Sequence, residues 1–152
     1  MLLLHADESL AALTDGLSDG SIALHSQPRA RQPSDDPADA FRDRARNLLV
    51  ACGELVRRSD VVAIADCPVA TGVLVAAGSL EIAVHGWDVT QACGNRQEIP
   101  PALAVELLKL APMLIAEADR EQLFARPAIV AAAASPSDRL AALLGRSPHR
   151  PA

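Results

Sequence analysis

The sequence predicts a mainly α-helical protein, and both its composition and its apolar spacing favour this class. Half of the 152 residues are hydrophobic but only 2% are aromatic, so the core must be built from alanine, leucine and valine. Such side chains suit helix-on-helix packing better than sheets. Apolar residues also recur at intervals of three and four along several long segments, which is the period of an amphipathic helix.

Two helices separated by a loop are predicted in the first part of the chain. Residues 2–18 carry leucines along one helical stripe, and glycines mark its end. Residues 19–36 are polar and contain prolines, which is typical of a surface loop. The second helix is predicted over residues 37–58, because Pro37 suits a first turn and apolar residues recur along one face.

The third helix is expected at the centre of the fold, because residues 72–93 are apolar on nearly all sides. A strand-like or extended stretch over residues 61–68 precedes it, and a fourth helix is predicted over residues 101–118. The remaining segments are predicted to be extended over residues 124–130, helical over 135–145 and a disordered tail over 148–152. A chain of this length suits one domain, here expected over residues 1–147.

Charge and cysteine usage exclude several classes of function. The net charge is −5 and no run of lysine or arginine occurs, so the sequence predicts no nucleic-acid partner. No apolar run reaches the roughly 20 residues that span a bilayer, and the first residues lack the basic region of a signal peptide. The odd number of cysteines does not indicate a disulfide framework. A cytoplasmic protein without a membrane partner is therefore expected.

Glu81 and His85 form the first candidate site. They stand four positions apart in the third predicted helix, which places both side chains on one face, about 5–6 Å apart at Cβ. A carboxylate oxygen and an imidazole nitrogen at that separation can share one metal ion. The alternative is that the two side chains form an ordinary hydrogen bond in the core. The only tryptophan, Trp87, and Asp88 lie just beyond the pair.

A third ligand would complete a catalytic type of zinc site, which typically has three protein ligands and one open position. His5 is the candidate, because it lies in the first predicted helix and could meet Glu81 and His85 across a bundle. The alternative is that His5 is an exposed histidine at a frayed helix end.

Three segments carry a resemblance to a known family. The segment from Ser79 to Val89 resembles the ExxxHxWD helix of the actinobacterial mycothiol-dependent maleylpyruvate isomerase-like proteins, which belong to the DinB-like superfamily. Residues 4–13 look like the family's earlier metal-histidine helix. Residues 138–148 look like its C-terminal ending. The resemblance covers residues 4–148.

The resemblance implies a DinB-like up-and-down helix bundle that holds a divalent metal, Zn²⁺, through His5, Glu81 and His85. Trp87 would pack at the bundle edge, and Asp88 would cap the helix or orient a ligand. Mycothiol would be the co-substrate. In maleylpyruvate isomerase this thiol adds to the double bond of the substrate, the adduct rotates, and elimination gives the trans isomer. Related proteins transfer the thiol to other small electrophiles.

The sequence departs from the family at its start. Family members usually carry a further long helix before the metal-histidine helix, whereas His5 lies almost at the beginning here. Two alternatives to the enzyme therefore stay open. One is a non-catalytic metal-binding bundle, and the other is an interaction module in which two chains form a homodimer.

Overall fold

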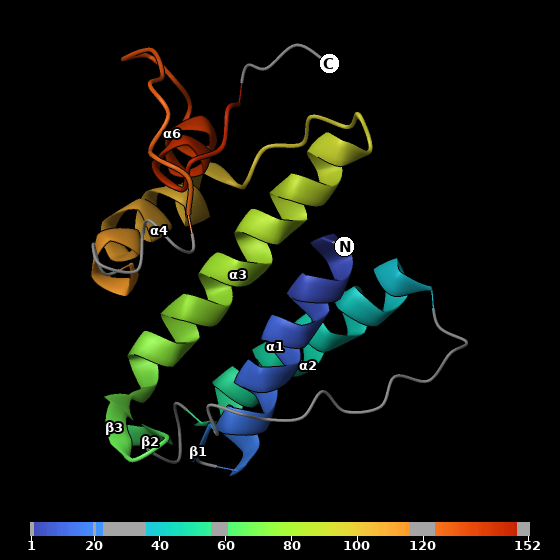
Figure 1. The fold of residues 1–152 in the computed structure, drawn as a ribbon, viewed down its shortest axis with the longest axis vertical. Helices are drawn as coiled ribbons and strands as arrows, with labels where there is room; N and C mark the ends of the chain where they lie inside the picture. The colour runs from blue at the N-terminus through green and yellow to red at the C-terminus, as the bar shows by residue number, and fades with distance from the viewer. Residues whose placement is uncertain (1, 20, 23–35, 56–60, 116–123, 149–152) are drawn as a thin grey trace. The chain divides into compact units, whose positions relative to one another are not determined.

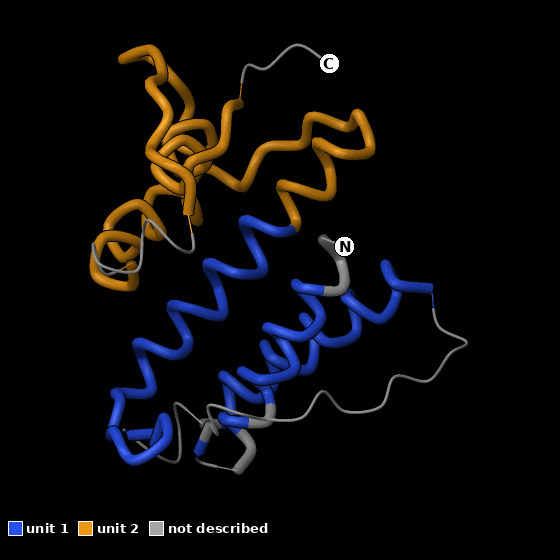
Figure 2. The backbone as a smooth tube through the Cα atoms, viewed as in Figure 1, with its two compact units in different colours: residues 1–85 blue, residues 86–152 orange. Residues whose placement is uncertain are grey.

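The computed structural model describes residues 2–19, 21–22, 36–55, 61–115 and 124–148. These residues are mainly helical, as predicted. They form two compact units, Met1–His85 and Gly86–Ala152, which Figure 2 colours separately. A single domain over residues 1–147 stays a prediction. No helix in the described part of the chain is long and apolar enough to cross a membrane.

The first unit combines helices with a small sheet (Figure 1). Its helices are α1 (Leu2–Asp19), α2 (Pro37–Leu55) and α3 (Thr71–Ala92), and the last of these continues into the second unit. Its strands are β1 (Ser21–Ile22), β2 (Val61–Ile64) and β3 (Cys67–Ala70), in the order β1-β2-β3. The predicted extended stretch is thus the hairpin β2–β3, joined by the two-residue turn Ala65-Asp66.

The sheet fixes the directions of the three helices. Strand β1 follows α1, strand β2 follows α2, and the two strands pair in parallel, so α1 and α2 end at the same end of the unit. Strand β3 leads directly into α3, which therefore starts at that end and runs the opposite way (Figure 1). The expected up-and-down alternation is not met between α1 and α2. The 17 residues between them can span roughly 55 Å when extended, twice the length of α2.

The core of the first unit lies where the three helices meet the sheet. Its buried residues are Leu10, Leu17, Leu48, Cys52, Val62 and Leu74. The four of these residues on α1 and α2 are seven and four positions apart, which is helical spacing, as the sequence pattern predicted. A leucine-rich interface supplies burial, and polar contacts and small residues can add to how the helices align.

The second unit is built around α4 (Pro101–Leu114) and α6 (Pro136–Leu143). Ser135 caps α6 by accepting a hydrogen bond from the backbone N–H of Asp138, and Pro136 follows at the first helical position. Buried Ser137 accepts a hydrogen bond from the backbone N–H of Ile99, at 3.0 Å. This contact ties α6 to the segment between α3 and α4.

The predicted helices match the observed ones to within a few residues where the structure describes them. Residues 124–130, which were predicted to be extended, form neither a helix nor a strand. Most of the predicted loop over residues 19–36, the last residues of the predicted helix 37–58, the end of the predicted helix 101–118 and most of the tail 148–152 lie outside the described residues.

Candidate functional site

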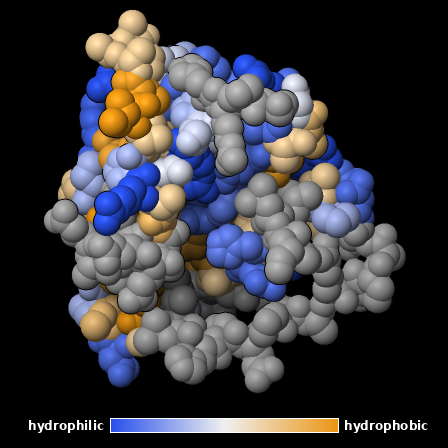
Figure 3. Space-filling model, turned by 45° about the horizontal axis from the view of Figure 1, so that its top comes forward, coloured by the Kyte–Doolittle hydropathy of each residue, from blue (hydrophilic) through white to orange (hydrophobic). Residues whose placement is uncertain are grey.

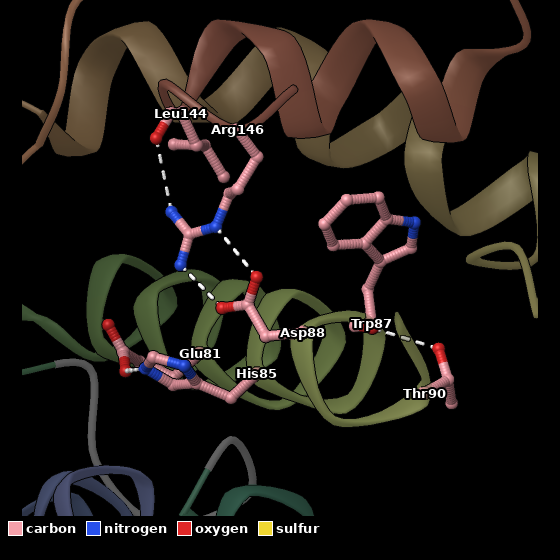
Figure 4. Close-up of polar contacts among 7 residues, drawn as sticks. All are labelled: Glu81, His85, Trp87, Asp88, Thr90, Leu144 and Arg146. Atoms are coloured by element: carbon pink, nitrogen blue, oxygen red, sulfur yellow. Dashed lines mark hydrogen bonds and ion pairs between the residues drawn. The ribbon is translucent and has the colours of Figure 1, made fainter. Parts of the chain in front are cut away.

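The three predicted metal ligands come from two helices of the first unit. Glu81 and His85 lie one turn apart on α3, and Figure 4 shows their side chains together, with His85 Nε2 and Glu81 Oε2 3.0 Å apart. The ring of His5, on α1, stands against the ring of His85 at a centroid distance of 5.4 Å and an interplanar angle of 90°. The structure thus brings the three side chains into one neighbourhood.

Gly78 explains how α1 reaches this part of α3. A Cβ placed on Gly78 would lie 3.1 Å from Cδ2 of Leu48 and 3.7 Å from Cδ1 of Leu13, so α1 and α2 both approach α3 there. His5 lies eight residues before Leu13, and His85 lies seven residues after Gly78. These intervals are about 12 Å and about 10 Å along antiparallel helices, so the two histidines arrive at a similar level.

The histidines differ in exposure, and this gives the site an open side. His85 is 8% exposed, whereas His5 is exposed and the Glu81 side chain is 33% exposed. Solvent therefore reaches the side chains of His5 and Glu81 more readily than that of His85. The rest of α3 around the pair is apolar or small, which lowers the local dielectric and strengthens any interaction with charge.

The contact between Glu81 and His85 has the distance of an ion pair without the alignment of a hydrogen bond. Glu81 Oε2 is buried, and within the described part of the chain no donor is aligned to bond it, although His85 Nε2 is 3.0 Å away. A neutral imidazole nitrogen and a carboxylate oxygen at this distance repel unless a proton or a cation lies between them. The separation is close to the roughly 3–3.4 Å expected of two donors bound to one zinc ion.

The donor set fits zinc. Two histidines, one carboxylate and an accessible side are typical of catalytic zinc centres. Two imidazoles that each bind one zinc ion through a nitrogen have ring centroids roughly 5 Å apart, so the separation of 5.4 Å between the rings of His5 and His85 is compatible with a shared ion. No group of three or more potential ligands in metal-holding geometry occurs among the residues that the structure describes, so the three side chains would have to reorient to bind one ion.

Trp87 and Asp88 belong to the second unit, where each has a structural partner. Trp87 is 8% exposed, and its carbonyl accepts a hydrogen bond from the hydroxyl of Thr90 at 2.8 Å. The Asp88 carboxylate is bound by the guanidinium of Arg146 (Figure 4). That Asp88 orients a metal ligand stays a prediction.

Two ion pairs were not identified in the sequence, namely Asp88–Arg146 and Asp7–Arg44. Their partners are separated by 58 and 37 positions, so no local spacing connects them. One signal was available for the second pair. Asp7 lies three residues before Leu10 within the leucine stripe of α1, where a charged side chain is unusual unless it is paired.

The cysteines offer no activated nucleophile among the described residues. Cys52 is buried in the core, and burial raises the pKa of its thiol against the smaller lowering effect of a backbone hydrogen bond. Cys67 and Cys93 are exposed and free. A raised pKa keeps Cys52 in the thiol form, which is a poor nucleophile and metal ligand.

Comparison with known proteins adds no assignment. No protein-family model, no curated protein and no solved structure matches this chain.

Proposed function

We propose that this protein is a metal-binding helical bundle of the DinB-like type, in which His5, Glu81 and His85 hold one divalent ion, zinc. We further propose that it supports isomerisation of, or thiol transfer to, a small electrophilic substrate, with mycothiol as the thiol. The observation that carries the proposal is the meeting of His5 with the Glu81–His85 pair from helices far apart in the sequence.

The buried carboxylate oxygen of Glu81 supports a cation at this position. An anionic oxygen removed from water without a hydrogen bond is strongly unfavourable, and a metal ion bound there would remove that penalty. A shared proton between Glu81 and His85 is the competing explanation. The exposed ring of His5 favours the metal, because a third donor next to the pair has no role in a shared proton.

In the proposed reaction the chain's own residues bind and position. Bound zinc would supply a positive charge that favours the thiolate form of a small thiol, which is the nucleophilic form. His85, which is buried, would fix the rear of the site, while exposed His5 and half-buried Glu81 would border the side by which thiol and substrate enter. No cysteine of the chain is required, since the sulfur comes from the small molecule.

Metal content is the measurement that tests this proposal first. The protein would be purified without a metal-affinity tag, and zinc would be measured in the wild type and in His85→Ala. About one zinc per chain, lost in His85→Ala and retained in the control His149→Ala, would support the site. Absence of stoichiometric metal after zinc is supplied and the excess is removed would contradict it.

Catalytic activity is tested separately from metal binding, so that either part of the proposal can be contradicted without the other. Zinc-loaded protein would be assayed for isomerisation of maleylpyruvate with mycothiol and for mycothiol consumption by small electrophiles. Turnover that disappears in Glu81→Gln would support an enzyme. Stoichiometric zinc without turnover of either kind would favour the non-catalytic metal-binding bundle.

Exposed apolar side chains favour a second candidate, the homodimeric interaction module. Leu49 and Val50 on α2 are 59% and 62% exposed, and Figure 3 shows hydrophobic residues at the surface among hydrophilic ones. Exposed apolar side chains that are neighbours on one helix can contribute to an interaction site. The mass in solution should then rise with concentration, Leu49→Asp should lower it, and His85→Ala should leave it unchanged. A concentration-independent monomer mass would contradict this candidate.

A further inference from the structure

A charged pair lies within the otherwise apolar interface between α1 and α2. Arg44 Nε donates a hydrogen bond to Asp7 Oδ1. The Asp7 side chain is 10% exposed, and the Arg44 side chain is 37% exposed, so the carboxylate is buried while part of the guanidinium reaches water. Both residues belong to the first unit.

The pair occupies positions that an apolar residue would fill in a simple interface. Asp7 shares the inner face of α1 with Leu10 and Leu17, which are 0% and 2% exposed. Arg44 stands between Phe41 and Leu48 along α2, three residues after the first and four before the second, and both of these side chains pack in the core. One polar pair therefore interrupts a continuous apolar seam.

A leucine-rich seam permits more than one alignment of its helices. Sliding α1 along α2 by one turn would bring other side chains of the same two faces together. The same slide would separate Asp7 from Arg44 and leave a carboxylate buried without its partner, which is strongly unfavourable. A single buried polar contact is a well-attested device for fixing helix register.

His5 depends on this register, because it lies two residues before Asp7 at the start of α1. A displacement of one turn is about 5.4 Å, as large as the distance between the two histidine rings. We propose that Arg44 is a positioning residue, which holds Asp7 and so keeps His5 over His85. The consequence for metal binding rests on the proposed function, whereas the placement of His5 does not.

The decisive variant replaces the pair by apolar residues, Asp7→Leu with Arg44→Leu. Such replacements commonly preserve or raise stability, so this protein should fold while its register is no longer fixed. The first readout needs no metal. In the apo protein the ring protons of His5 should carry a ring-current shift from the nearby ring of His85. The difference between the wild type and His85→Ala measures this shift. We expect the double leucine variant to lose this shift.

Metal affinity supplies the second readout, using Co²⁺ as the probe. The double leucine variant should bind Co²⁺ roughly 10-fold or more weakly than the wild type, as should His5→Ala, and adding His5→Ala to it should cause no further loss. Leu17→Ala, at the other end of α1, is the matched control. It should lower stability without changing the ring shift or the Co²⁺ affinity.

Two results would overturn the inference. One is a double leucine variant that keeps the His5 ring shift, and the other is a Leu17→Ala variant that loses the shift to the same degree. The exchanged pair, Asp7→Arg with Arg44→Asp, should restore the shift if it folds. If the wild type binds no metal, the proposed function is wrong. The ring-current shift of His5 still tests whether Arg44 positions His5.

Discussion

Arg146 binds both carboxylate oxygens of Asp88: Nε donates to Oδ1 at 3.0 Å and Nη2 donates to Oδ2 at 2.6 Å. This two-point contact joins the end of α3 to the segment after α6 within the second unit. Gly145 positions Arg146 for this contact with Asp88. The backbone N–H groups of Gly145 and Arg146 bond the carbonyls of Ala142 and Ala141, which is the Schellman ending of a helix.

Replacing Gly145 should therefore damage the second unit. Gly145 has φ +79°, and a Cβ at this position would lie 2.4 Å from the carbonyl oxygen of Ala125. We expect Gly145→Ala to lower the free energy of unfolding by about 2–4 kcal/mol, from the left-handed backbone and the overlap together. Gly94→Ala is the control, because Gly94 has φ +72° with nothing within 4 Å, and should cost about 1–2 kcal/mol. Urea unfolding measures both, and equal losses would contradict the role of the close contact.

The Asp88–Arg146 pair should contribute more to stability than a surface pair. The side chains of Asp88 and Arg146 are 14% and 25% exposed, whereas those of Glu106 and Lys109 are 63% and 64% exposed. Asp88→Asn should destabilise by about 1.5–3 kcal/mol, because a partly buried charge loses its partner. Glu106→Gln should change stability by less than about 0.5 kcal/mol. Similar losses of stability in the two variants, measured by thermal unfolding, would show that burial does not determine how much an ion pair contributes to stability.

The hairpin turn contains a residue that a glycine should improve. Ala65 has φ 51°, which is the left-handed region and unfavourable for a residue with a Cβ. We expect Ala65→Gly to raise the free energy of unfolding by about 0.5–1 kcal/mol. Ala132 is an exposed turn alanine without a positive φ, so Ala132→Gly should instead destabilise slightly. A loss of stability in Ala65→Gly would contradict this account.

The thiols should differ in reactivity and in their effect on the pH dependence of stability. Exposed Cys67 and Cys93 should react with a thiol reagent in the native protein, and Cys52 only after unfolding.

Because burial raises the pKa of Cys52 in the folded state, the folded protein binds the thiol proton more tightly than the unfolded chain does. The resulting stabilisation is complete below the unfolded pKa of about 8.5 and is lost as pH rises through the higher folded pKa.

Comparison with Cys52→Ala tests whether the thiol of Cys52 makes stability fall as the pH rises. Between about pH 8 and pH 10 the wild type should lose stability more steeply than Cys52→Ala, because only the wild type carries this thiol. A steeper loss in the variant would contradict a raised pKa. Mass spectrometry of the alkylated native protein checks the order of reactivity independently.

Structural features that depend on neighbouring residues were predicted from the sequence, whereas features that depend on residues far apart in the chain were not. The helical period identified the helices because it reports the buried face of each segment. The Ser135-Pro136 start of α6 is likewise a local signal. The parallel pairing of β1 with β2 was not predicted, because a two-residue strand carries no pattern of its own.

The candidate site shows the same difference between local features and features that join distant residues. The spacing of Glu81 and His85 was sufficient to place both on one face of a helix, and the contact at 3.0 Å agrees with that interpretation. The reason that His5 arrives beside them was not visible in the sequence. It requires the close approach at Gly78 and the pairing of Asp7 with Arg44, each of which joins residues from separate helices.

Helix α3 belongs to both compact units, and this has a consequence for the order of folding. Only residues 86–92 of its 22 residues lie in the second unit, while residues 71–85 lie in the first. Isolated helices shorter than about 12–15 residues are marginal in water, so the shorter piece cannot nucleate efficiently alone. Trp87 and Asp88 thus receive their helical geometry by propagation from the preceding turns. We therefore expect loss of helical structure around His85 to spread forward along α3 into residues 86–92.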